Sequence, residues 1–194
     1  LPAHRYRAPL DRQTPARSCA GWFMTATFSM ARVNDMDRAT FAEVFGQVYE
    51  ESYWVAESAW EQRPFADRAA LANAMEQIVR AAGSDQVLAL FRAHPRLGIV
   101  APMSDYSREE QAGAGLRGRG AATEEDRIVL AKLNDDYEAK FSFPFIIAVR
   151  GHTPASIIEA CSSRLSADRE PEIQQSLEQV CKIAGLRLAD LIEK

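Results

Sequence analysis

The stretch that decides the fold is PEIQQSLEQVCKIAGLRLADLI, residues 171–192. Its apolar side chains recur at the three- and four-residue spacing that lines one face of an α-helix. They are Ile173, Leu177, Val180, Ile183 and Leu188. A helix with one apolar face must bury that face against other elements, so this stretch predicts the last helix of a packed bundle.

The same helical period runs through most of the chain from residue 37 onward. Polar residues divide it into separate helices, because their side chains can accept hydrogen bonds from the free backbone N–H groups at a helix start. These candidate caps are Asp37, Asp67, Ser84, Ser107, Thr123 and Thr153. One helix should end at His94, because a residue that precedes a proline disfavours helical geometry.

Two segments depart from the helical period. Residues 143–149, FPFIIAV, form a short apolar run with β-branched side chains, which predicts a buried extended segment. Residues 1–33 contain three prolines and no hydrophobic period, which predicts a disordered or non-native N-terminal extension. We therefore predict an all-α fold, a single-domain helical bundle over residues 34–194 with one short buried extended segment.

The composition fits one soluble core in a reducing compartment. The chain has 194 residues, of which 47% are hydrophobic and 26% charged. No apolar run approaches the roughly 20 residues that span a membrane, so no membrane association is expected. Three cysteines without CxxC spacing favour a cytoplasmic protein over a disulfide framework or a zinc site. They are Cys19, Cys161 and Cys181.

The net charge of −4 is unevenly distributed. Residues 1–30 carry a local charge of +3, so the remainder carries −7. An acidic body argues against a nucleic-acid-binding domain, since phosphate contacts need a basic face. One alternative stays open, in which the basic head and Arg117 and Arg119 bind nucleic acid with a steep salt dependence.

Polar residues between positions 94 and 111 carry the candidate chemistry. His94 lies at a helix end beside a loop, and because histidine titrates near neutral pH, both a structural and a catalytic role are open. Ser107 and Glu110 have the three-residue spacing of a capping box. Glu110 and Gln111 also place a carboxylate and an amide side by side, a pair that can recognise a ureido or amide group.

A single cation interrupts the apolar stripe of the last helix. Arg187 lies between two leucines, and its side chain either reaches out to solvent or points into a pocket. A buried guanidinium would bind a carboxylate through two parallel hydrogen bonds. Arg150, directly after the apolar run, competes for that role.

Several short motifs occur together in the order found in one family. They are HPRLG at 94–98, SREEQ at 107–111, AGL at 114–116, LNDDY at 133–137, FPFIIAV at 143–149 and GLRL at 185–188. Over roughly residues 37–192 the chain resembles the 2-oxo-4-hydroxy-4-carboxy-5-ureidoimidazoline (OHCU) decarboxylases of urate and purine catabolism. Each motif is weak alone, but their order is specific. Ser142 stands where the family usually has glycine.

The resemblance implies an all-helical homodimer that converts OHCU to (S)-allantoin without a metal or an organic cofactor. The family's substrate carries its carboxylate beside a C=N group, so the electrons released with CO₂ can flow into the substrate's own ring. His94 matches the catalytic proton donor, and Glu110 is implied to assist catalysis. Substrate-binding roles are implied for Pro95, Ser107, Arg108, Glu109, Glu110, Gln111, Phe145, Ile146, Ile147, Ala148, Val149 and Arg187.

The alternative function is a helical binding or regulatory module without catalysis. In that case Ser107 and Glu110 only cap a helix, and Arg187 lies at the surface. This alternative predicts that His94, Glu110 and Arg187 lie more than ~10 Å apart, too far to reach one substrate.

Overall fold

The computed structural model describes residues 27–98, 102–116 and 122–193. Within these ranges every regular element is a helix, and the only β-type pairing is an isolated bridge between Phe28 and Ile192. The helices are α1 (Met30–Asn34), α2 (Arg38–Phe45), α3 (Tyr53–Trp60), α4 (Arg68–Arg80), α5 (Ser84–Ala93), α6 (Asp105–Gly113), α7 (Glu124–Phe141), α8 (Pro154–Arg164) and α9 (Arg169–Leu191). The predicted all-α fold is confirmed.

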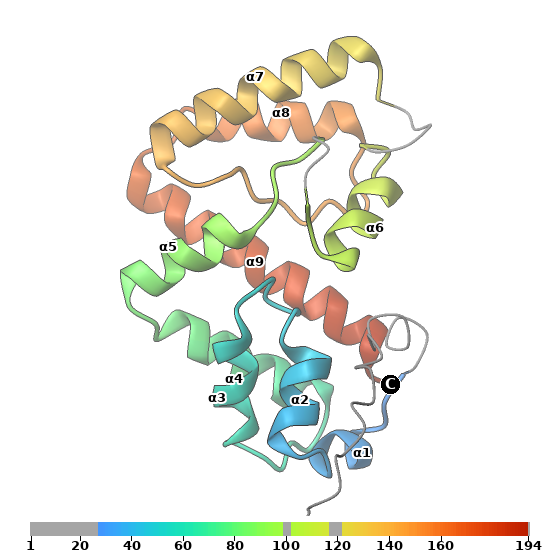
Figure 1. Cartoon of the computed structure of the whole chain (residues 1–194). Coiled ribbons are helices and arrows are strands. Elements are labelled where there is room, and N and C mark those ends of the chain that lie inside the picture. Colours follow the sequence, from blue (N-terminus) through green and yellow to red (C-terminus); the bar gives the residue numbers. More distant parts are fainter. Residues whose placement is uncertain (1–26, 99–101, 117–121, 194) are drawn as a thin grey trace, which may run out of the picture.

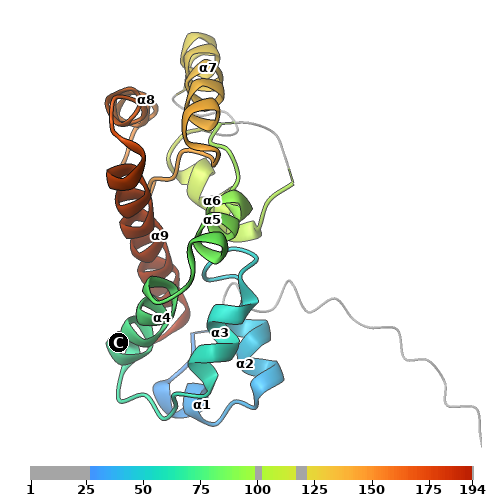
Figure 2. The same ribbon diagram turned by 90° about the vertical axis from the view of Figure 1, so that its left-hand side faces the viewer.

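Helix α9 runs through the middle of the molecule. Helices α1–α4 gather toward its C-terminal end, and α7 and α8 lie at its N-terminal end (Figure 1 and, from the side, Figure 2). Its apolar stripe is buried at Leu177, Val180 and Leu188. The helix begins at Arg169 rather than Pro171, because a proline in the first turn lacks only an N–H that has no intrahelical partner there.

Most predicted helix starts are confirmed. The side chains of Asp37, Asp67, Thr123 and Thr153 each accept a hydrogen bond from a backbone N–H in the first turn. The predicted cap at Ser84 is wrong, because Gly83 takes the extended N-cap conformation and Ser84 is the first helical residue. The predicted capping box of Ser107 and Glu110 is also wrong. Helix α6 begins at Asp105, and its cap is Ser104, three residues before Ser107.

The segment 143–149 is buried and extended, as predicted, and side chains of α8 and α9 hold its backbone. The Arg164 guanidinium donates to the carbonyl of Ile146 (2.8 Å), and the N–H of Ala148 donates to the Gln179 side chain (3.0 Å). Ser142, which precedes the segment, adopts a left-handed conformation with φ of 67°. A glycine is unstrained at such a position, which accounts for the glycine expected there.

The boundary of the folded domain lies earlier than predicted. Residues 27–33 fall within the predicted extension, but α1 begins at Met30, and Val33 is fully buried. Phe28 exchanges backbone hydrogen bonds with the end of α9, which fixes this segment in place. The rest of the predicted extension, residues 1–26, lies outside the described residues. In the described part, no helix has the length and apolar character needed to cross a bilayer.

Candidate active site

A small cavity brings together most of the residues for which a site role is expected. Its volume is about 30 Å³, enough for a water molecule. The expected residues that line it are His94, Pro95, Ser107, Glu110, Gln111, Phe145, Ile146, Ile147, Val149 and Arg187. Helices α5, α6 and α9 and the extended segment thus converge on one point.

Three expected residues do not line this cavity. Arg108 and Glu109 are exposed on α6, and Arg108 pairs with Asp105. Ala148 is buried, but its side chain does not reach the cavity wall, and its N–H is taken by Gln179. The reason for the first two is the helical period, since residues 107, 110 and 111 share one face of α6 whereas 108 and 109 face away.

His94 is held by the end of its own helix. Helix α5 stops there because Pro95 follows, and the ring Nδ1 lies 2.9 Å from the carbonyl of Leu90. A carbonyl only accepts, so Nδ1 carries a proton and donates it, which leaves Nε2 as the ring nitrogen available to a ligand. Burial lowers the pKa of His94 below its usual 6.5, and the Glu50 carboxylate offsets part of this effect.

Arg187 is the centre of the site's hydrogen-bond network. Its side chain is 1% exposed, so a solvent-reaching arginine is excluded. The guanidinium binds Glu110 through two hydrogen bonds, from Nε (2.9 Å) and Nη2 (2.8 Å). Nη2 also donates to Glu50 (2.7 Å) and Ser107 (3.1 Å), and Nη1 donates to two backbone carbonyls. The carboxylates that Arg187 binds therefore belong to the protein.

Glu50 is the charged residue of the cavity that sequence reasoning missed; the apolar Leu97 and Ile183, which also line it, were not expected there either. It is 2% exposed, in the turn between α2 and α3, and it accepts hydrogen bonds from Arg187 and the Ser107 hydroxyl. Burial raises the pKa of Glu50, but Arg187, His94 and the Ser107 hydrogen bond together lower it below its usual value. The only sequence signal for Glu50 is a carboxylate directly after the apolar residues Val48 and Tyr49. The adjacent Glu51 has nearly the same surroundings in sequence, but it is exposed.

Gln111 holds the loop that follows His94. Its side-chain oxygen accepts from the N–H of Gly98 (3.0 Å), and its amide nitrogen donates to the carbonyl of Arg96 (3.4 Å). Arg150, the competitor of Arg187, does not line the cavity; it forms a half-exposed pair with Asp190. Among the described residues, no group of three or more His, Cys, Asp or Glu side chains is arranged to hold a metal ion.

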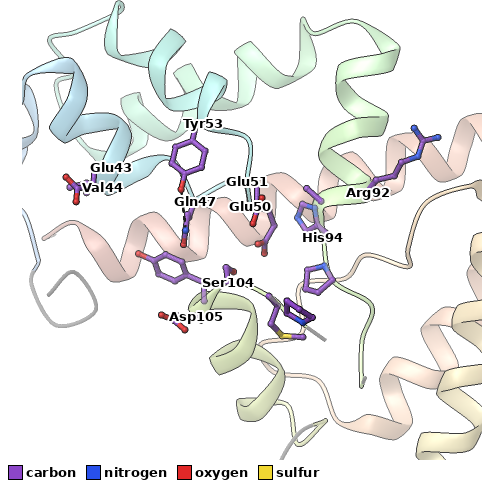
Figure 3. A pocket seen from close by; sticks show the side chains of 15 residues that line it. Glu43, Val44, Gln47, Glu50, Glu51, Tyr53, Arg92, His94, Ser104 and Asp105 are labelled. Atoms are coloured by element: carbon purple, nitrogen blue, oxygen red, sulfur yellow. Dashed lines mark hydrogen bonds between the residues drawn. The ribbon is translucent and has the colours of Figure 1, made fainter. Parts of the chain in front are cut away.

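A larger groove leads to this cavity from outside. It has a volume of about 670 Å³, within the usual range of small-molecule sites. Glu50, His94 and Pro95 line both hollows, so the groove ends at the candidate acid–base groups. Figure 3 shows the Glu50 side chain and the His94 ring side by side in this groove. The groove rim is mainly acidic, with Glu43, Glu51 and Asp105.

The fold and the site together define an all-α protein with a buried acid–base cluster at the end of an open groove. The family model for OHCU decarboxylase matches residues 34–189. The chain belongs to the OHCU decarboxylase family, and it is therefore a carboxy-lyase of urate degradation.

Individual relatives support this membership. An OHCU decarboxylase of Halalkalicoccus jeotgali is 42% identical over 159 residues, which cover 82% of this chain and 89% of that protein. The uric acid degradation bifunctional protein PucL of Bacillus subtilis is 41% identical over 165 residues. These cover 85% of this chain but 33% of PucL, so the chain spans about a third of that relative.

Two solved structures share the fold. A crystal structure of (S)-allantoin synthase matches with a TM-score of 0.70 and 30% identity, covering 87% of this chain and 54% of that chain. The chain thus spans about half of that protein. A crystal structure of OHCU decarboxylase in the presence of (S)-allantoin matches with a TM-score of 0.62 and 25% identity, covering 74% and 94%.

Proposed function

We propose that this chain decarboxylates OHCU to (S)-allantoin in the cavity between α5, α6 and α9, with His94 and Glu110 as the catalytic residues. The observation that carries the proposal is that His94, Glu110 and Ser107 line one cavity at the end of the groove, in a chain of this family. The non-catalytic alternative requires His94, Glu110 and Arg187 to lie apart, and this common cavity argues against it.

The chemistry requires one well-placed proton and little else. Loss of CO₂ leaves an electron pair that the adjacent C=N group of the substrate takes into its ring. A proton must then be added on one face to set the handedness of the product. Nε2 of His94 is the group proposed to hold that proton, because Nδ1 is committed to Leu90.

The polar groups around His94 are proposed to orient the substrate. Of the two carboxylates that pair with Arg187, that of Glu110 is the less buried, with 18% of its side chain exposed. Glu110 is therefore the one proposed to accept hydrogen bonds from a ureido group. Arg187 fixes the plane of that carboxylate through its two parallel hydrogen bonds. In this proposal Arg187 acts on the substrate through Glu110.

The test is the pair His94→Ala and Glu110→Ala, assayed with freshly generated OHCU. Circular dichroism at the allantoin band is the readout, because spontaneous decarboxylation gives racemic product. We expect each variant to lose about 10²–10⁴-fold in kcat, the usual contribution of positioned proton transfer. His152→Ala is the matched control, because the His152 ring hydrogen-bonds to Ser156 on α8 and does not line the cavity, so this variant should keep full activity. Full activity in both site variants would overturn the assignment.

We also propose, from the family resemblance, that the protein is a cytoplasmic homodimer. Sedimentation velocity at micromolar concentration tests the oligomeric state. A single species at the mass of one chain, 21.6 kDa, would overturn the dimer. The nucleic-acid alternative rests on residues 1–30 and on Arg117 and Arg119, most of which lie outside the described residues, and nothing in the site favours it.

A further inference from the structure

Glu50 is the buried charge that the proposed reaction does not yet use. It lies in the turn between α2 and α3, far in sequence from the motifs around His94 and Arg187. Its backbone has a φ of 48°, the left-handed region that side chains other than glycine and asparagine rarely adopt. Ser142, at the start of the extended segment, is the only other described non-glycine residue with positive φ. Unfavourable backbone conformations of this kind concentrate at functional sites.

The contacts of Glu50 explain why a carboxylate occupies this unfavourable position. Nη2 of Arg187 donates to Glu50 at 2.7 Å and to Glu110 at 2.8 Å, so one guanidinium nitrogen bridges two carboxylates. The Ser107 hydroxyl donates to Glu50 as well. Glycine or asparagine at position 50 would adopt this backbone conformation with less strain, but neither would place a negative charge beside Arg187.

The cluster holds more negative than positive charge. One guanidinium and two carboxylates leave a formal charge of −1 in a pocket from which water is largely excluded. The groups that act on His94 electrostatically are Glu50, Glu110 and, with opposite sign, Arg187. Three further charged residues, Arg92, Arg96 and Glu138, line a neighbouring hollow with His94. Arg92 donates to the carbonyl of Ser142, and Arg96 forms ion pairs with Asp135 and Glu138.

We propose that Glu50 is a positioning residue of this active site, whose carboxylate orients Arg187 and Ser107 and supplies a negative charge that favours the imidazolium form of His94. The inference rests on the proposed function, because it assigns Glu50 a task in the same reaction. Glu50 lines both the outer groove and the inner cavity, as His94 does, so its charge stands where the substrate must pass.

The direction of the effect on His94 follows from the signs. A nearby carboxylate stabilises the imidazolium, so removing its charge lowers the pKa of the ring. The limb of the pH–rate profile that reports His94 must then move to lower pH, whether the reaction uses the ring as donor or as acceptor. A purely structural Glu50 would change stability and leave that limb in place.

The experiment compares Glu50→Gln with Glu51→Gln, the exposed carboxylate next in the chain. The first readout is the NMR titration of the His94 ring in substrate-free protein, assigned with His94→Ala. We expect the midpoint in Glu50→Gln to fall by about one pH unit, as for loss of a nearby opposite charge. We expect kcat to fall about tenfold with KM changed less, because the lost contact serves proton transfer. The control should match the wild type in both.

The outcomes separate this proposal from the proposed function. A His94 midpoint and a kcat equal to wild type in folded Glu50→Gln would overturn the role of Glu50. Full activity in His94→Ala would overturn the proposed function, while the substrate-free titration would still decide whether Glu50 sets the charge of the ring. If Glu50→Gln fails to fold, Glu50→Asp moves the charge away by one methylene. Its midpoint should then fall by a smaller amount, and an unchanged midpoint overturns the proposal.

Discussion

Two buried arginine–carboxylate clusters flank the two halves of α9, and they differ in charge. At its N-terminal half, Glu172 accepts from Arg164 and from the hydroxyls of Tyr137 and Ser176. One cation and one anion make this cluster neutral. At its C-terminal half, Arg187 binds both Glu50 and Glu110, which leaves a formal charge of −1. The neutral cluster braces the extended segment, whereas the charged one lines the cavity with His94.

The difference shows what separates a bracing ion pair from one that lines the candidate active site in this fold. Arg164 also donates to the carbonyl of Ile146 and to Ser176, and it lies 4.7 Å from the ring of Phe145. Neither Arg164 nor Glu172 lines the groove or the cavity. A buried network whose charges cancel and whose groups are hydrogen-bonded makes the core rigid. The surplus carboxylate beside His94 is compensated only by a proton or by a donor on the substrate.

The largest effect should come from removing the cation of the charged cluster. Arg187→Met leaves Glu50 and Glu110 without their cation, and breaking a buried ion pair costs about 3–5 kcal/mol of unfolding free energy. Urea unfolding at pH 7 measures it, and catalytic activity should be lost as well. Adding Glu50→Gln to the variant should recover part of the stability, because one of the two unpaired charges is then absent.

The pH dependence provides a second measurement on the same variant. The pKa of Glu50 is lowered in the folded protein, so its contribution to stability is present above the unfolded value of about 4.3 and is lost as the pH falls through the folded value. The stability curves of wild type and Arg187→Met should therefore approach each other on acidification. If the two stability curves stay parallel, the unpaired carboxylates of Glu50 and Glu110 are not the cause of the stability lost in Arg187→Met.

A smaller effect is expected at the neutral cluster. Glu172→Gln removes the charge partner of Arg164, whose side chain is 14% exposed and therefore partly solvated. We expect a loss of about 2 kcal/mol in unfolding free energy, the usual cost of a hydrogen-bonded partner removed from a charged group. The NMR midpoint of His94 should stay at its wild-type value. If the His94 midpoint moved as far as in Glu50→Gln, the two clusters would not differ in their electrostatic effect on His94.

The sequence predicts most of the fold, because most of the helices, though not α1, have local start signals and apolar periods. Asp37, Asp67, Thr123 and Thr153 cap helices through hydrogen bonds within their own first turns, so their roles are legible from spacing alone. The start of α6 was misplaced because Ser104 and Ser107 are one turn apart and both suit a cap. In the structure Ser104 is the cap, because its hydroxyl accepts from the N–H of Ser107, whereas the Ser107 hydroxyl donates to Glu50.

The residues of the candidate site could be predicted only where a motif contains them. His94, Glu110 and Arg187 are found through the family resemblance, but Glu50 is not, because nothing local distinguishes it from Glu51. Burial of one and exposure of the other follow from the turn between α2 and α3 and from the distant Arg187. Arg164 and Glu172 were missed for a similar reason, since their pairing depends on the turn that joins the end of α8 to the start of α9.

The smallest effect is expected at Arg150, the cation that competes with Arg187 on sequence grounds. Its pair with Asp190 is about half exposed on both sides, and such pairs contribute about 0–1 kcal/mol because water and salt screen them. Arg150→Ala should therefore lose less than about 1 kcal/mol in urea unfolding, and less still at high salt. Its kcat/KM for OHCU should equal that of the wild type, since Arg150 does not line the cavity. A tenfold loss in kcat/KM would indicate that Arg150 binds the substrate. The comparison of the two clusters of α9 would then not identify the charged groups on which the substrate depends.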